Sequence, residues 1–126
     1  MIYSKDPKNW QQLESWVANV FTDIGCDTSV GIPAKDSDGI IDVDVWVVDN
    51  RDKPAVSYHV ECKHWGDNQV GGKAVSRLID DLGNTSANRG MIVSTSGFDQ
   101  EAYDAAGGHP IDLLSFDELQ TRYWPR

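Results

Sequence analysis

Cationic side chains are scarce in this chain, and their scarcity limits what it can bind unaided. Eleven Lys and Arg stand against twenty Asp and Glu, so the formal net charge is −9 at pH 7. Nucleic-acid binders are usually basic, because contacts with phosphates supply most of their affinity. The composition therefore excludes a broad basic surface. It is compatible with a local basic patch, or with help from a second domain, a second subunit or a partner.

Long apolar runs and cysteine clusters are also missing. No segment approaches the roughly 20 apolar residues that a membrane-spanning helix needs, and the first residues contain no apolar signal region. These absences predict a cytoplasmic protein with no membrane association. The only two cysteines, Cys26 and Cys62, lack the spacing of metal ligands. We expect Cys62 to be a reduced, buried thiol.

The length and the apolar periodicity predict one α/β domain over residues 1–126. At 126 residues and 40% hydrophobic content, the chain can bury a single core. Helical spacing of apolar residues predicts helices over 7–24, 70–82 and 99–106, and a capping box at Ser115–Glu118 opens a last helix. Strands are predicted over 29–32, 40–48, 55–63, 91–95 and 111–114. This order predicts a mixed sheet of four or five strands between two helical layers.

The segments 40–48 and 55–63 are predicted to form a β-hairpin, since the residues between them are rich in turn formers. If Val48 opposes Ala55, then Asp42 lies opposite Glu61. A register that differs by two would put Asp44 there instead. Alternation of side chains gives this hairpin one apolar face and one polar face. The polar face collects Asp42, Asp44, His59, Glu61 and Lys63.

Two opposed carboxylates on that polar face predict a cation site. The Cβ atoms of directly opposed residues lie about 5 Å apart. Like charges at that distance repel each other, and a divalent cation between them relieves the repulsion. Asp42 and Glu61 are thus the predicted metal ligands, with Asp44 as the rival of Asp42. Lys63 follows Glu61 by two residues and shares its face.

The order of elements and the motifs together resemble the PD-(D/E)xK nuclease superfamily, and within it the Mrr-like (type IV) restriction endonuclease group. The triplet Glu61-Cys62-Lys63 alone is a weak signal, because such triplets occur by chance. Its position after an aspartate hairpin, and before helix, strand, helix and strand, is far more specific. The segments that carry the resemblance are 10–14 with Gly25, 39–43, 59–63, 87–98, 102–106 and 111–114.

This resemblance implies a restriction-endonuclease-like three-layer α/β/α fold and a divalent-metal-dependent endonuclease that hydrolyses DNA. It implies Mg²⁺ or Mn²⁺ on Asp42, Glu61 and the Cys62 backbone carbonyl. Lys63 would stabilise the transition state, and Glu14 would add an outer carboxylate. Gln69 is a candidate for orienting the attacking water. Lys73 and Arg77, four residues apart on a predicted helix, are candidates for phosphate contact.

The alternatives concern activity and substrate. The chain could be a silent nuclease-fold module that serves binding or assembly, or a nuclease of branched DNA or RNA. Fold alone does not decide among these functions. The implied settings are restriction of foreign DNA and DNA repair. Because two strands need two cuts, the expected partners are DNA together with a second copy of the chain or a separate DNA-recognition domain or subunit.

Overall fold

A five-stranded mixed sheet forms the middle layer of the protein. The computed structural model describes residues 2–35, 40–51 and 53–123, with the backbone alone at 32–35 and 40–42. The strands follow the sheet in chain order: β1 (Asp27–Lys35), β2 (Ile40–Asp49), β3 (Val56–Lys63), β4 (Arg89–Ser94) and β5 (Ile111–Ser115). β1, β2 and β3 pair antiparallel, whereas β4 is parallel to both β3 and β5. The predicted mixed sheet is confirmed.

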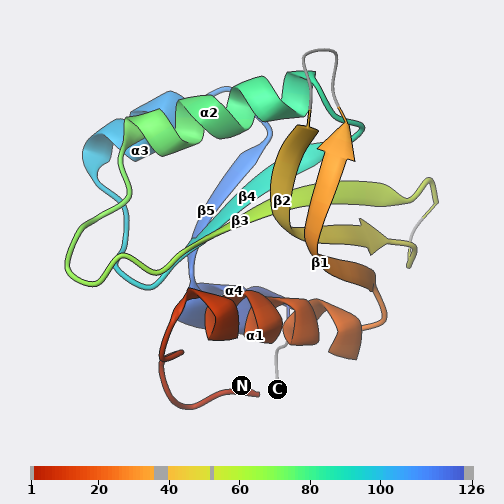
Figure 1. The fold of residues 1–126 in the computed structure, drawn as a ribbon, viewed down its shortest axis with the longest axis horizontal. Coiled ribbons are helices and arrows are strands. Elements are labelled where there is room, and N and C mark those ends of the chain that lie inside the picture. Colours follow the sequence, from red (N-terminus) through yellow and green to blue (C-terminus); the bar gives the residue numbers. More distant parts are fainter. Residues whose placement is uncertain (1, 36–39, 52, 124–126) are drawn as a thin grey trace.

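Helices cover both faces of the sheet, as Figure 1 shows. α2 (Gly72–Gly83) and α3 (Gln100–Ala106) lie on one face, and α1 (Trp10–Asp23) and α4 (Phe116–Tyr123) lie on the other. Each face has its own apolar core. The α1/α4 core buries Val45, Val60 and Met91, and the α2/α3 core buries Leu78 and Ile92. The predicted three-layer arrangement is confirmed.

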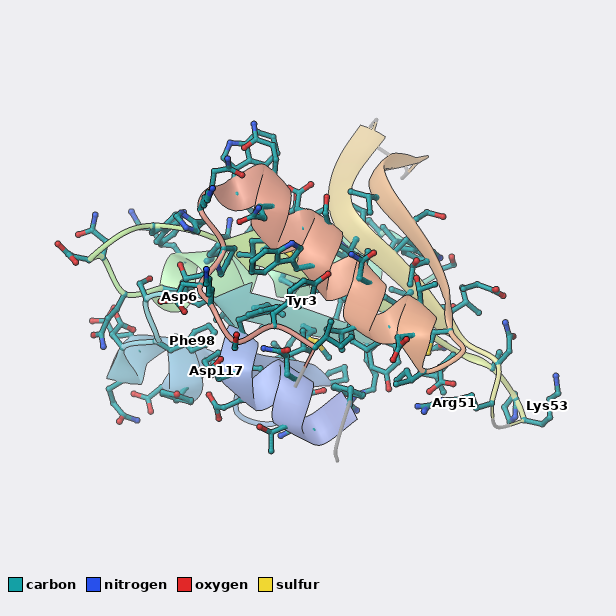
Figure 2. The ribbon with its side chains drawn as sticks, turned by 90° about the horizontal axis from the view of Figure 1, so that it is seen from below. Tyr3, Asp6, Arg51, Lys53, Phe98 and Asp117 are labelled. Atoms are coloured by element: carbon teal, nitrogen blue, oxygen red, sulfur yellow. The ribbon has the colours of Figure 1, made fainter. Side chains whose placement is uncertain are left out.

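The N-terminal segment joins α1 to α4. In Figure 2, Tyr3 lies between these two helices. Its ring stacks on Trp16 of α1 at 4.1 Å between centroids and also contacts Phe116 of α4. The Gln120 side-chain amide accepts a hydrogen bond from the Tyr3 N–H and donates one to the Tyr3 carbonyl. The buried Gln120 side chain therefore has partners and costs little to bury.

Two predicted helix starts were wrong. Asp6-Pro7 was expected to open α1, but Asn9 is its N-cap, and the Asn9 Oδ1 atom accepts a hydrogen bond from the Gln12 N–H at 2.8 Å. α2 begins at Gly72 rather than at Val70, because the Val70 backbone is used in an isolated bridge with Phe98. The capping box at α4 is confirmed. The side-chain oxygens of Ser115 and Glu118 each accept a hydrogen bond from the backbone N–H of the other residue, at 3.0 Å.

The predicted hairpin is present, but its predicted register was wrong by two residues. Asp49 pairs with Val56 and Val45 with Val60. β2 runs one residue further than predicted, because the Asp49 carboxylate accepts hydrogen bonds from the backbone and guanidinium of Arg51 and the turn starts only afterwards. A shift of two preserves the faces, so Val43, Val45, Val47, Val60 and Cys62 are buried as expected.

Gly90, the second residue of β4, leaves no room for a side chain. A Cβ there would lie 2.7 Å from Ile111 Cδ1 and 2.9 Å from Leu78 Cδ2, both in the α2/α3 core. We predict that Gly90→Ala lowers the free energy of unfolding by about 1–3 kcal/mol through overpacking. Urea unfolding measures this. Gly83→Ala is the matched control, because a Cβ there meets nothing within 4 Å. Equal stability of both variants would contradict the close packing at Gly90.

Candidate active site

The candidate site begins where β2 and β3 part. Their pairing ends at Val45 and Val60, and the next residues are Asp44 and Glu61. The Asp44 Oδ2 atom accepts a hydrogen bond from the Cys62 backbone N–H at 2.9 Å. A side chain thus takes the place of the next ladder bond. Asp44 is therefore the carboxylate that the structure describes beside Glu61.

Asp44 and Glu61 influence each other's pKa. Burial, and then the charge of Glu61, raises the pKa of Asp44 to about 6, although the Cys62 N–H and Lys63 oppose this. Burial also acts to raise the pKa of Glu61, but the hydrogen bond and charge of His59, together with Lys63, outweigh it and hold that pKa below its ordinary value. Of the two carboxyl groups, Asp44 is therefore the one that takes up a proton first as the pH falls.

Glu14 brings a third carboxyl group from the opposite helical layer. It lies on α1 and is 8% exposed. Burial, followed by the charges of Asp44 and Glu61, raises its pKa to about 7. The structure therefore brings Glu14 into the electrostatic range of the pair. Three carboxyl groups in one buried place create a strong demand for positive charge.

Lys63 lies beside this pair, as expected from its position on β3. Its Nζ atom is 3.9 Å from Glu61 Oε2 and stands 5.3 Å from the centre of the Trp65 ring. Such a contact between an ammonium and an indole is attractive. Trp65 is 42% exposed. It covers the lysine instead of filling the interior.

A cavity of about 210 Å³ opens next to these residues and is lined by Glu61, Lys63, Trp65, Lys73, Ala74 and Arg77. The predicted phosphate contacts Lys73 and Arg77 thus share a cavity with the candidate centre, and together with Lys63 they make its rim locally basic. Gln69 is exposed and lies beside Gly97 instead, with its amide nitrogen 3.8 Å from where a Gly97 Cβ would stand. It is not among the lining residues.

His59 and Asp81 join the site in a way that the sequence did not indicate. His59 was expected opposite Asp44 but pairs with Trp46, and it is completely buried. Its Nε2 atom is 2.8 Å from Glu61 Oε1. Asp81 of α2 lies close to both, with ligand atoms of the three residues within 4.8 Å of one another. The signal for Asp81 was its spacing: it follows Arg77 by four residues and so shares a helix row.

The predicted ligand Asp42 has its side chain outside the described residues. Its backbone belongs to β2 and pairs with Pro33 of β1. Strand alternation puts it on the same face as Asp44. Its role as a ligand stays a prediction. Cys62 is a free, buried thiol as expected, and burial raises its pKa far above its ordinary value, so the thiol is inert at neutral pH.

The donor set fits a hard divalent cation. Carboxylate and carbonyl oxygens are the ligands that Mg²⁺ and Mn²⁺ prefer. Burial, and then the charge of Glu61, raises the pKa of Asp44 to about 6, so the pair disfavours two uncompensated negative charges. Asp44, Glu61 and the Cys62 carbonyl, supported by Glu14, therefore suit an ion of that class.

The fold and this cluster define a restriction-endonuclease-like α/β domain. A family of restriction endonucleases, Mrr_cat, matches residues 6–123, and the chain belongs to this family. The uncharacterized protein y4cE of Sinorhizobium fredii is 33% identical over 100 residues, which are 79% of this chain and 25% of that protein. The chain thus spans only a quarter of the length of this relative.

Solved structures share the fold. A protein of unknown function, AF1548, aligns with a TM-score of 0.76 at 18% identity, over 86% of this chain and 59% of that one. Protein VC1899 from Vibrio cholerae aligns with a TM-score of 0.64 at 22% sequence identity, over 87% of this chain and 31% of that one. The DNA modification-dependent restriction endonuclease AspBHI aligns with a TM-score of 0.55 at 26% sequence identity. The alignment covers 84% of this chain and 28% of that one. Among the described helices, none has the length and apolar character to cross a membrane.

The raised pKa of Glu14 predicts a pH-dependent stability in the absence of metal. A carboxyl group whose pKa is higher in the folded state costs stability as the pH rises from its unfolded to its folded pKa. For Glu14 this window runs from its ordinary value of 4.5 to about 7. We predict that Glu14→Gln becomes progressively more stable than the unmodified protein across this window in EDTA, and that Mg²⁺ narrows the gap. Urea unfolding at several pH values measures it; a gap that does not change with pH would contradict the buried carboxyl group.

Proposed function

We propose that this chain is the catalytic domain of a divalent-metal-dependent endonuclease that hydrolyses DNA phosphodiester bonds, in restriction of foreign DNA or in DNA repair. The observation that carries the proposal is the Asp44–Glu61 pair with Lys63 beside it. The membership of a restriction endonuclease family supports it. The likeness to AspBHI, a DNA modification-dependent restriction endonuclease, supports DNA as the substrate.

In this proposal, Asp44, Glu61 and the Cys62 carbonyl hold Mg²⁺ or Mn²⁺, and Asp42 is the alternative ligand on the same face. When bound, such an ion polarises a phosphate oxygen and lowers the pKa of a water molecule. The Cys62 N–H fixes the orientation of the Asp44 carboxylate, since their hydrogen bond is 2.9 Å long. Glu14 adds negative charge behind the ligands and draws the cation in.

Lys63 acts on the phosphate. Its ammonium lies 3.9 Å from Glu61 and contacts the Trp65 ring, so two neighbours hold it in place. A positive charge placed in advance stabilises the charge that develops on the phosphate oxygens in the transition state. Lys73 and Arg77 on the same cavity wall bind the neighbouring phosphates of the strand. These few cations provide the local basic patch that a net charge of −9 requires.

Sequence recognition is proposed to come from elsewhere: a separate domain or subunit, or a second copy of the chain. The acidic total charge supports this, because the basic rim of the cavity is small. The lengths of the relatives are consistent with it, since the chain spans 25% of y4cE and 28% of AspBHI. Plasmid, branched, single-stranded and RNA substrates, with and without base modification, incubated with Mg²⁺ or Mn²⁺, test the activity. If no substrate is cut, the chain is a silent nuclease-fold module.

The ligand assignment predicts which carboxylates hold the ion. Asp44→Asn and Glu61→Gln each remove an anionic donor from a site with few, so we predict at least a tenfold loss of Mn²⁺ affinity for each, on the order seen for residues that merely support a ligand. Calorimetric titration measures it. Asp42→Asn is the matched comparison and should bind nearly as well as the unmodified chain. If Asp42→Asn is the damaging change, Asp42 is the ligand and Asp44 is not.

The proposed role of Lys63 predicts a loss of rate without a loss of fold. We predict that Lys63→Ala slows cleavage by roughly 10²–10³, the usual effect of removing one preorganised charge. Mn²⁺ binding should persist, because Lys63 offers no ligand oxygen. Stability should change by no more than about 0.5 kcal/mol.

The matched control for this change is Lys53→Ala. Lys53 lies at the far tip of the β2–β3 hairpin, beyond the helices, as Figure 2 shows. Its loss removes the same charge without touching the cavity, so cleavage should be unaffected. Unfolding of Lys63→Ala would mark a structural ion pair with Glu61 instead. Full activity of that variant would place the chemistry elsewhere.

A further inference from the structure

We propose that His59, Glu61 and Asp81 form a second divalent-cation site, on the α2 side of Glu61, which takes a first-row transition ion such as Mn²⁺ or Zn²⁺. The site goes beyond the proposed nuclease centre and shares only Glu61 with it. β3 supplies His59 and Glu61, and α2 supplies Asp81. Their candidate ligand atoms all lie within 4.8 Å of one another.

The donor chemistry differs from that of the proposed nuclease centre. One imidazole nitrogen with two carboxylates is a mixed nitrogen and oxygen set, which suits Zn²⁺, Mn²⁺ and related ions. A tetrahedral Zn²⁺ has bonds of about 2.0–2.2 Å to nitrogen and oxygen, which place neighbouring ligand atoms about 3.5 Å apart. His59 Nε2 and Glu61 Oε1 are 2.8 Å apart, so only a small adjustment separates the observed arrangement from a ligating one.

Two groups in this cluster lack partners of their own. The His59 Nδ1 atom is buried and has no hydrogen-bond partner among the residues that the structure describes. A buried polar atom without a partner is uncommon and costs stability. The half-buried Asp81 carboxylate likewise makes no ion pair or side-chain hydrogen bond within the described ranges. A cation held by His59 Nε2 leaves Nδ1 as it is, so the group that the cation would satisfy is the Asp81 carboxylate.

The local charge balance favours a cation. Burial raises the pKa of Asp81, and the negative charge of Glu61 raises it further. His59 and Arg77 act in the other direction. Arg77 precedes Asp81 by one helical turn but is exposed and borders the neighbouring cavity. Lys63 is on the other side of Glu61, near Oε2, while His59 is near Oε1. The Oε1 side of Glu61 is thus the side that lacks a permanent positive charge.

The test uses Mn²⁺ and a spectroscopic signal that the oxygen site cannot give. The 126-residue chain, free of any histidine tag, is titrated with Mn²⁺, and pulsed electron paramagnetic resonance detects coupling of the ion to a ¹⁴N nucleus. We expect two Mn²⁺ per chain, one of them coupled to histidine nitrogen. Asp81→Asn should lower the affinity for this nitrogen-coupled ion at least about tenfold. His59→Gln should abolish the nitrogen coupling.

Matched variants separate the two sites. Asp80→Asn changes the exposed neighbour of Asp81, and His64→Gln removes a histidine that is bonded to the Pro7 carbonyl; both should leave the nitrogen-coupled ion unchanged. Asp44→Asn should remove the uncoupled ion and keep the coupled one, so a failed nuclease assignment is distinguishable from a failed second site. His59 is fully buried, and if its variant does not fold, Asp81→Asn decides.

Bound Mn²⁺ without nitrogen coupling in the unmodified chain would overturn the proposal, and so would coupling that survives Asp81→Asn undiminished. In either case, His59 and Asp81 would only orient Glu61.

Discussion

The hydrogen bond from the Cys62 N–H to the Asp44 carboxylate is the contact on which the site depends. It forms because β2 and β3 stop pairing after Val45 and Val60, so a side chain meets a backbone donor that would otherwise lie buried without a partner. The same bond brings two carboxylates together. Burial, and then their repulsion, raises the pKa of Asp44, and a bound cation would relieve that repulsion. Fold and chemistry meet in this one bond.

Charge is distributed unevenly in a way that the net value hides. At −9, the chain as a whole repels a polyanion. Yet the cavity beside the carboxylates is bordered by Lys63, Lys73 and Arg77, and Trp65 shields the first of these from solvent. Over a Debye length of about 10 Å, such a local patch is felt before the distant acidic surface is. Local arrangement, rather than composition, decides what can approach.

Alternation and spacing were enough to predict the five strands, the four helices and the apolar face of the hairpin, because they depend on local periodicity alone. The site was predicted less completely. The register depended on where the turn begins, and the Asp49–Arg51 hydrogen bonds that set it involve side chains whose geometry no pattern encodes. Asp81 was not predicted, because its proximity to His59 arises only when α2 packs against the sheet.

The central position of β3 has a consequence for the timing of synthesis. β3 supplies Glu61 and Lys63, but its second neighbour, β4, begins only at Arg89, after the whole of α2 has been made. Until then the strand lacks one hydrogen-bonded edge, and the α2 side chains have no sheet to pack against. The basic wall of the cavity, which α2 supplies, therefore joins the carboxylates and the lysine of the β2–β3 hairpin late. The proposed centre would therefore be complete only after β4 has joined the sheet.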